Sequence, residues 1–340
     1  MPESRAFLKV EGIKKYYRQT IQEERPVEER SIFRSRIKTH RATVKAVDGV
    51  SFQLALGETL GIIGESGCGK STLGRVLVQI EPMTEGTITI GGRNVQTLLQ
   101  EDALRYRRSS QMVFQNPFDT FDPRYTLERI FQEVLELHSI GENREERREI
   151  ILETLEAAGL RPATDYLQRH PHELSGGQLQ RISILRAMLL EPSLLVADEP
   201  VSMLDVSVRA DILRMLEKLH RDHEMAMIFI SHDIATTRYV SDRVAVMYLG
   251  RIVELASTDE VLHNPRHPYT KVLISNTASL DPLEERKIIE VKGEPPNPVN
   301  TGVGCYFAPR CYKAQPHCFD VYPELRELTP DHHVSCHYPD

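Results

Sequence analysis

Short apolar runs alternate with longer amphipathic segments through the middle of the chain. The runs predict strands at Val50–Leu56, Thr59–Ile63, Gly86–Ile90, Gln111–Phe114, Ser193–Ala197 and Met225–Ile230. Helical patterns follow Thr72, extend over much of Thr126–Leu190 with a break at Gly159–Pro162, and return at Val208–His220. Strands that alternate with helices indicate an α/β fold with a largely parallel sheet covered on both faces.

The two ends of the chain have weaker patterns. Phe7–Tyr17 predicts a short strand and turn, whereas the charged segment Arg18–Lys45 shows little apolar periodicity, so we expect an exposed loop there. Past Arg266 the pattern weakens again, and Gly293–Pro298 (GEPPNP) predicts a Pro-rich spacer.

The net charge argues against nucleic acid as a partner, and the hydropathy argues against a membrane-spanning helix. Lys and Arg number 42 against 49 Asp and Glu, a net charge of −7, so no overall positive field is available to bind nucleic acid. No apolar run approaches the roughly 20 residues of a membrane helix, and Met1–Val10 lacks the apolar core of an export signal. If the protein works at a membrane, we expect it to dock there.

A glycine-rich segment carries the first clear chemistry. Gly64–Thr72 reads GESGCGKST, a full match to the phosphate-binding loop GxxxxGK[ST], and it lies between a predicted strand and a predicted helix. Backbone amides and the helix N-terminus suit the phosphates, Lys70 suits the β- and γ-phosphates, and Ser71 suits Mg²⁺. The candidate ATP ligands here are Gly64, Ser66, Gly67, Cys68, Gly69, Lys70, Ser71 and Thr72. We interpret Cys68 as a spacer rather than a redox thiol.

Two adjacent carboxylates follow the apolar strand at Leu194–Ala197. Asp198 and Glu199 reach the carboxyl edge of the sheet, where the phosphate loop also lies. Phosphoryl transfer needs one group for the metal and one for the water, so we assign Asp198 to Mg²⁺ and Glu199 to the general base.

A second glycine motif opens the last helix of the amphipathic stretch. Leu174–Gln178 reads LSGGQ, and Ser175 stands as an N-cap with glycines behind it. That geometry suits an anion but equally suits an ordinary capped helix. LSGGQ between a phosphate loop and a strand ending in Asp-Glu resembles the signature of the ATP-binding cassette (ABC) ATPases.

The resemblance to ABC ATPases covers roughly residues 7–256. It implies a P-loop NTPase cassette with a core parallel sheet, an antiparallel β subdomain and a helical subdomain at about residues 116–190. We therefore expect a nucleotide-binding domain over residues 1–264 and a small Cys-rich extension over residues 265–340.

The same resemblance implies roles for residues outside the phosphate loop. Tyr17 resembles the aromatic that stacks on adenine, with Tyr16 as the alternative. Gln115 resembles the glutamine that contacts Mg²⁺ and the attacking water and senses the membrane partner. Ser202–Asp205 (SMLD) resembles the loop that links two sites of a dimer, with Asp205 as the communicating residue, although Met203 replaces the usual small residue. His232 resembles the switch histidine at the γ-phosphate; without the other motifs, a histidine after a strand is more often a surface or packing residue.

The family pattern also implies a dimer. In ABC ATPases the LSGGQ of one subunit completes the ATP site of the other, so Ser175, Gly176, Gly177 and Gln178 are expected to contact the partner's ATP. Because Glu199 and His232 are both present, this subunit's own site is expected to be competent for hydrolysis.

Non-transport ABC proteins are the alternative class. DNA-repair members separate the two motifs by long coiled coils, and ribosome-associated members carry two cassettes in one chain. Neither pattern matches this sequence, which has about a hundred residues between Thr72 and Leu174.

Other markers resemble the dipeptide, oligopeptide and nickel uptake group: Gln115–Arg124 (QNPFDTFDPR), His267-Pro268-Tyr269 and a tail bearing cysteines. This resemblance implies an ATPase for peptide uptake, or for another solute such as nickel, at the cytoplasmic face of the inner membrane. The implied partners are a second, nonidentical ATPase subunit, two permease subunits and an external solute-binding protein.

Four of the five cysteines lie in the last 36 residues: Cys305, Cys311, Cys318 and Cys336. In a reducing compartment, clustered thiols are more often metal ligands than disulfides. Their spacing alone does not choose the metal. Similar tails in the peptide-transporter group are associated with a [4Fe-4S] cluster, whereas His317, His332, His333 and His337 nearby keep zinc as an alternative.

Overall fold

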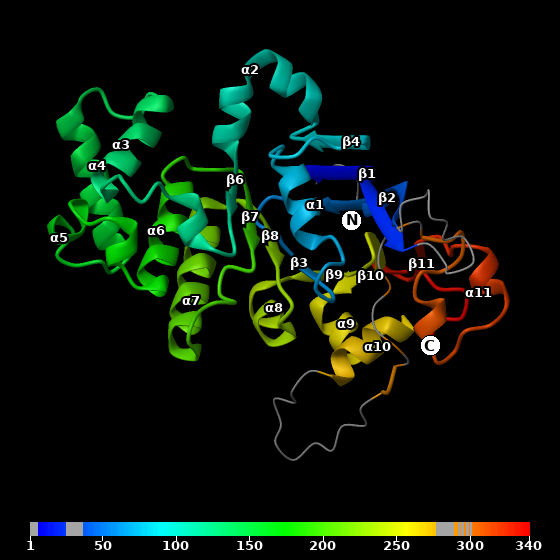
Figure 1. Cartoon of the computed structure of the whole chain (residues 1–340). Helices are drawn as coiled ribbons and strands as arrows, with labels where there is room; N and C mark the ends of the chain where they lie inside the picture. Colours follow the sequence, from blue (N-terminus) through cyan, green and yellow to red (C-terminus); the bar gives the residue numbers. More distant parts are fainter. Residues whose placement is uncertain are drawn as a thin grey trace.

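The computed structural model describes residues 6–24, 37–276, 289–291, 293, 296, 299 and 301–340. Two sheets form its framework (Figure 1). The larger sheet has the order β11-β12-β10-β9-β3-β8-β7-β6. Its strands are β3 (Thr59–Ile63), β6 (Ser110–Val113), β7 (Leu194–Asp198), β8 (Ala226–Ile230), β9 (Arg243–Tyr248), β10 (Arg251–Ser257), β11 (Arg326–Thr329) and β12 (His332–Val334).

The centre of the larger sheet is parallel, as predicted. Strands β9, β3, β8, β7 and β6 pair in parallel, and every residue of β3, β7 and β8 is buried. Helices pack on both faces of these strands, which explains why the strands read as continuous apolar runs in the sequence. The parallel register brings the carboxyl ends of β3, β6, β7 and β8 to one edge.

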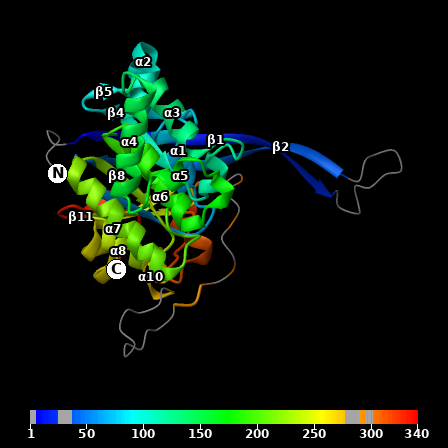
Figure 2. The ribbon, with the colours of Figure 1, turned by 90° about the vertical axis from the view of Figure 1, so that its left-hand side faces the viewer.

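The smaller sheet is antiparallel and has the order β2-β1-β4-β5. Its strands are β1 (Leu8–Glu24), β2 (Ile37–Leu54), β4 (Glu85–Ile90) and β5 (Arg93–Asn94). Figure 2 shows β1 and β2 extending together away from the rest of the molecule. Their pairing continues from Leu8 opposite Leu54 to Glu24 opposite Ile37.

The loop predicted at Arg18–Lys45 is therefore wrong at both of its ends, where residues 18–24 and 37–45 are paired strands. Two strands that bond to each other satisfy their backbone groups within the pair, so the strands can continue through residues 18–24 and 37–40, where the sequence is mostly polar. Residues 25–36 of that prediction lie outside the described part of the chain.

Most helices pack around the two sheets, and helices α3 to α6 form a separate helical layer. The α-helices are α1 (Lys70–Leu77), α2 (Val95–Ser109), α3 (Leu127–Leu137), α4 (Arg144–Ala157), α5 (Thr164–Leu167), α6 (Gly176–Met188), α7 (Val206–His223), α8 (Ile234–Val240), α9 (Thr258–His263), α10 (Pro268–Ser275) and α11 (His317–Asp320). The short 3-10 helices are η3 (Pro117–Thr120), η4 (Pro171–Glu173) and η5 (Ala308–Arg310). Helices α3 to α6 enclose their own apolar core around Phe131, Leu155 and Ile182. In the described residues, no helix is long and apolar enough to cross a membrane.

Residues 301–340, which we call the cysteine tail, continue the larger sheet. Strand β12 pairs antiparallel with β10, and β11 pairs with β12. The carboxylate of Glu254 on β10 is fully buried and lies 2.7 Å from His332 Nε2 on β12. Only Gly293 and Pro296 of the predicted Pro-rich spacer lie within the described part. The domain boundary near residue 265 stays a prediction.

Candidate active site

The phosphate loop, Gly64–Thr72, connects β3 to α1 and is held between two other strands. A Cβ atom on Gly69 would lie 2.0 Å from the carbonyl oxygen of Ala46, and one on Gly64 would lie 2.2 Å from that of Met247. Both glycines also have left-handed φ angles, +103° at Gly69 and +155° at Gly64. Only glycine fits at these two positions, because the backbone approach is too close for any side chain.

The basic residue of the loop is fixed by the loop itself. Lys70 is buried, and its ammonium donates hydrogen bonds to the carbonyl oxygens of Gly64 at 2.8 Å and Glu65 at 3.0 Å. Cys68, within the loop, is buried, and burial raises the pKa of its thiol, so the thiol stays protonated near neutral pH. This fits its interpretation as a spacer.

Two oxygen ligands suited to magnesium lie side by side. The hydroxyl of Ser71 donates to Oδ1 of Asp198 at 2.9 Å. Burial is the largest effect on Asp198 and raises the pKa of its carboxyl, and the charge of Glu199 raises it further. A hydroxyl and a carboxylate that is costly to leave uncompensated form a donor set of the hard oxygen type that Mg²⁺ prefers. The residues present therefore fit the predicted ion.

Glu199 lies at the meeting point of three elements. Its Oε2 accepts a hydrogen bond from the Gln115 amide at 2.9 Å, and its Oε1 lies 3.1 Å from Nδ1 of His232. The φ angle of Glu199 is +46°, in the left-handed region that non-glycine residues rarely adopt. The backbone amide of Glu199 donates to the carbonyl of Ile230 at 2.9 Å, which holds this strained conformation in place.

These groups line one hollow of about 470 Å³. Most of the predicted ATP-site residues line it: Ser66, Gly67, Gly69, Lys70, Ser71, Thr72, Gln115, Glu199 and His232. Asp198 adjoins it through Ser71, whereas Gly64 and Cys68, although part of the loop, do not line it. Tyr17 does not line the hollow; its hydroxyl donates to the carboxylate of Glu81. The adenine role of Tyr17 stays a prediction.

Two residues that line the hollow were not predicted from the sequence. Val44 and Ala46 on β2 line the same space, opposite the phosphate loop. Val44 falls in the segment predicted as a loop, Arg18–Lys45, and Ala46 directly follows it. A usable signal was present, because Arg41–Ala46 alternates polar and apolar residues with the period of a strand.

The LSGGQ motif forms a second, separate surface. Ser175 is the N-cap of α6 and forms a capping box with Gln178, which confirms the predicted helix start. Ser175, Gly176, Gly177 and Gln178 line a hollow of about 340 Å³ together with Met203 and Asp205. Among the described residues, none lines both this hollow and the phosphate-loop hollow.

The four cysteines of the tail come together although they are spread over the sequence. Cys305, Cys311, Cys318 and Cys336 all line one small cavity of about 20 Å³, which we call the cysteine cavity. Burial raises the pKa of the Cys305 thiol to about 11. However, no group of three or more His, Cys, Asp or Glu side chains in the described residues is arranged to hold a metal ion. The described residues therefore gather the four thiols at one cavity but do not show the predicted iron-sulfur or zinc site.

Comparisons with known proteins identify the family of this chain. A family model described as ABC transporter matches residues 47–202, and one described as the C-terminal region of oligopeptide/dipeptide transporters matches residues 253–318. The putative oligopeptide transport ATP-binding protein YkfD of Bacillus subtilis is 45% identical over 310 residues, which span 89% of this chain and 94% of that protein. The chain belongs to the ABC transporter family, among its peptide transport ATP-binding proteins.

Two further relatives extend the family assignment over the whole chain and to the fold. The dipeptide transport ATP-binding protein DppF of Haemophilus influenzae is 42% identical over 338 residues, covering 99% of this chain and 98% of that protein. A solved dimeric ATP-binding cassette in a post-hydrolysis state, bound to ADP and Pi, is 26% identical with a TM-score of 0.59 and covers 74% of this chain and 98% of its own. The cassette fold and the ABC ATPase domain are confirmed for this chain.

Proposed function

We propose that this subunit binds Mg-ATP at the phosphate-loop hollow and hydrolyses it to drive the uptake of dipeptides or oligopeptides. The observation that carries the proposal is the convergence of Lys70, Ser71, Gln115, Glu199 and His232 on one hollow. The names of the relatives support the peptide solute. Nickel and other small solutes remain the alternative.

In this proposal each side chain has one task. The loop amides and Lys70 bind the phosphates, and Ser71, Asp198 and Gln115 would hold Mg²⁺, which would supply charge neutralisation at the phosphate oxygens. Glu199 accepts a proton from the attacking water, and His232 contacts the γ-phosphate. Because Gln115 and His232 both contact Glu199, they orient its carboxylate toward the water.

The test is Glu199→Gln in the full chain. This change keeps the shape and the bond to Gln115 but removes the base, so hydrolysis is expected to fall about a hundredfold or more. Calorimetry is expected to show unchanged Mg-ATP binding. Glu149→Gln, an exposed position on α4, is the matched control. Normal turnover by the Glu199 variant would refute the base assignment.

We infer a dimer, and the separation of the two hollows supports it. We infer that the LSGGQ hollow, with Ser175, Gly176, Gly177 and Gln178, completes the ATP site of a second, nonidentical subunit, and that Asp205 connects the two sites. Met203 and Val206 beside it have 63% and 80% of their surface exposed, which supports a protein partner at this surface.

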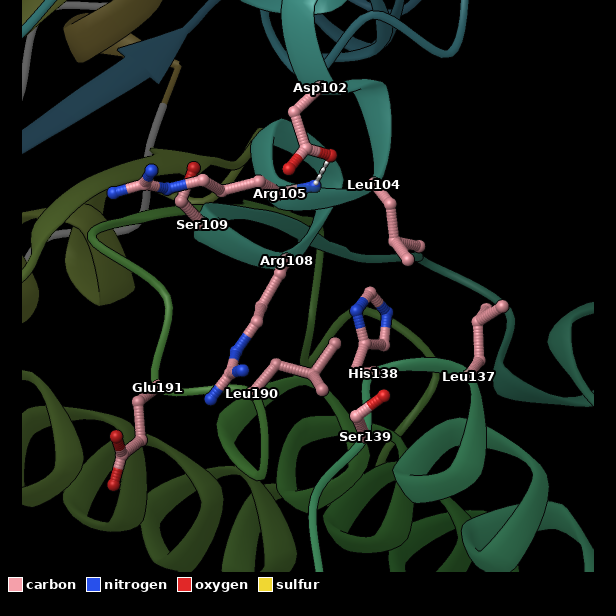
Figure 3. Close-up of a pocket in the computed structure, with 10 residues that line it drawn as sticks. All are labelled: Asp102, Leu104, Arg105, Arg108, Ser109, Leu137, His138, Ser139, Leu190 and Glu191. Atoms are coloured by element: carbon pink, nitrogen blue, oxygen red, sulfur yellow. Dashed lines mark hydrogen bonds between the residues drawn. The ribbon is translucent and has the colours of Figure 1, made fainter.

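The membrane partners are proposed to dock on the cassette from the cytoplasmic face. A hollow of about 450 Å³ opens between α2, the end of α3 and the residues after α6 (Figure 3). Leu104 and Leu137 border it with 41% and 61% of their surface exposed, beside Arg105 and Arg108. Helix α2 leads directly into β6, which ends just before Gln115. A permease segment bound in this hollow would therefore contact a helix that is connected directly to the active site. Solute choice would lie in the two permeases and the external binding protein.

We also propose that the four tail cysteines hold an iron-sulfur cluster. Their convergence on the cysteine cavity supports it, since four thiolates suit a [4Fe-4S] cluster. Iron, sulfide and zinc analysis with an absorption spectrum, on anaerobically purified protein, is the test. About four irons and four sulfides per chain are expected, lost in Cys305→Ser and kept in Cys68→Ser. Zinc or no metal would refute the cluster and leave the ATPase assignment intact.

A further inference from the structure

The cysteine tail touches the phosphate loop directly. Arg310 in η5 contacts Glu65, the second residue of the loop, with a two-pronged pair: Nη1 to Oε2 at 2.9 Å and Nη2 to Oε1 at 3.3 Å. The Arg310 side chain is 10% exposed and that of Glu65 is 27% exposed. A planar guanidinium that binds both oxygens of a carboxylate in a half-buried setting fixes orientation as well as distance.

A second contact to the same loop residue comes from the His267-Pro268-Tyr269 segment. The hydroxyl of Tyr269 accepts a hydrogen bond from the backbone amide of Glu65 at 2.9 Å. His267 is buried, and its Nδ1 accepts from the amide of Tyr269 at 3.0 Å, which caps α10 and fixes the position of the tyrosine. The motif is therefore a support for the phosphate loop.

An aromatic cluster joins these two supports. The rings of Tyr248, Tyr269 and Phe307 lie 4.6, 5.3 and 5.4 Å apart, and all three side chains are buried. Phe307 belongs to the tail, whereas the tyrosines come from β9 and α10. Close-packed interiors transmit displacements, so a shift of Phe307 would move Tyr269 and Arg310 together.

Three separate groups of Glu65 are thus held by contacts. Its amide bonds to Tyr269, its carboxylate pairs with Arg310, and its carbonyl accepts from the ammonium of Lys70 at 3.0 Å. We propose that Arg310 and Tyr269 are positioning residues for ATP binding: they hold Glu65 so that its carbonyl keeps Lys70 directed at the phosphates. The proposal rests on the phosphate-loop hollow being the ATP site.

Two consequences follow from this arrangement. A loop that is preorganised loses less conformational freedom when nucleotide binds, so loosening Glu65 weakens binding. The coupling is also reciprocal. If the tail contact strengthens nucleotide binding, then nucleotide binding must stabilise the tail by the same free energy. Since η5 runs directly into Cys311, the cysteine cavity lies at the end of the same connection.

The first test is the dissociation constant of Mg-ATP for the full chain, measured by calorimetry. Arg310→Gln and Glu65→Gln are each expected to weaken binding about three- to tenfold, the range for a half-buried charge pair. The double variant is expected to lose no more than either single one, because both remove one contact. Arg310→Lys is expected to recover part of the loss. Arg326→Gln, an exposed tail arginine that donates to the Cys336 carbonyl, is the control and should bind normally.

Tyr269→Phe keeps the aromatic ring and removes only the acceptor, so it carries the test even if the tail of an Arg310 variant fails to fold. The second readout is hydrogen exchange at the backbone amides of Phe307, Ala308, Arg310 and Cys311. Mg-ATP is expected to slow this exchange in the Glu199→Gln chain, and the effect should disappear when Glu65→Gln is added.

Unchanged ATP affinity in Glu65→Gln and Tyr269→Phe would overturn the inference, and so would exchange that ignores nucleotide. Lys70→Ala separates this failure from failure of the ATP site. If Lys70→Ala abolishes binding while the Glu65 and Tyr269 variants bind normally, only the positioning role is refuted. If Lys70→Ala binds normally, the proposed ATP site itself is wrong.

Discussion

Replacing Asp48 with asparagine removes a buried charge from a junction of both sheets and the cysteine tail. Asp48 on β2 is 2% exposed. Its Oδ2 accepts two bonds from the Arg251 guanidinium, at 2.9 and 2.7 Å, and one from the Tyr306 hydroxyl at 2.7 Å. Its Oδ1 accepts from the hydroxyl of Tyr16 on β1.

The size of the effect can be worked out from these contacts. Each hydrogen bond to a charged group contributes about 1.5–3 kcal/mol, and breaking a buried pair by removing one charge costs about 3–5 kcal/mol. An asparagine with its oxygen at the Oδ2 position keeps the three bonds from Arg251 and Tyr306, but it presents an NH₂ group to the Tyr16 hydroxyl and leaves Arg251 without its countercharge. We therefore expect Asp48→Asn to lower the free energy of unfolding by about 3–4 kcal/mol.

Chemical denaturation of the full chain, followed by circular dichroism, measures this loss. Asp242→Asn is the matched control: Asp242 is exposed and accepts one bond from the amide of Thr59 at 2.8 Å, which asparagine can still accept. It is expected to cost less than about 1 kcal/mol. If Asp48→Asn cost no more than the control, the assignment of Asp48 as a stabilising junction would be refuted.

The pH dependence of stability gives an independent check. Although burial opposes it, hydrogen bonds from Tyr16, Tyr306 and Arg251 lower the pKa of the Asp48 carboxyl below its ordinary value. A lowered folded-state pKa gives stability that is present above the ordinary pKa of about 4 and is lost as the pH falls through the folded-state value. The native chain should therefore lose more stability below about pH 4 than Asp48→Asn does. Parallel acid titrations would contradict this.

Two other substitutions test the loop and the tail. Gly69→Ala is expected to abolish Mg-ATP binding by calorimetry, because its Cβ would lie 2.0 Å from the Ala46 carbonyl oxygen; Gly67→Ala, with no atom within 4 Å, should lose less. Glu254→Gln is expected to cost about 3–5 kcal/mol and to speed hydrogen exchange in β12, since both carboxylate oxygens already accept bonds. Normal binding by Gly69→Ala, or unchanged exchange in β12, would contradict the respective argument.

Local sequence patterns predicted the parts of the site that local chemistry determines. The phosphate loop, the Asp198-Glu199 pair and the N-cap at Ser175 depend on residue types at fixed spacing, so they could be read from the sequence. The parallel centre of the sheet was also predictable, because strands buried on both faces are apolar throughout. The meeting of Gln115, Glu199 and His232 required the family resemblance, since they are far apart in the sequence.

Features that depend on distant partners could not be predicted in the same way. Residues 18–24 and 37–40 of the β1–β2 pair are mostly polar and show little apolar pattern, and the strands β11 and β12 are too short and polar to be recognised alone. The contact of Arg310 with Glu65 joins residues 245 positions apart. Glu65 stands at a variable position of the phosphate-loop motif and Arg310 stands in no motif, so nothing in the sequence marks them as partners.

The tail contacts bear on how the chain folds as a unit. Tyr306, Arg310 and His332 of the tail contact three carboxylates on three different elements: Asp48 on β2, Glu65 in the phosphate loop and Glu254 on β10. Burying a carboxylate is costly unless it is paired and hydrogen-bonded. Removing residues 301–340 would take a partner from all three at once and uncover an edge of β10. The tail therefore contributes to the stability of the cassette, and its loss is expected to weaken the phosphate loop as well as the sheet edge.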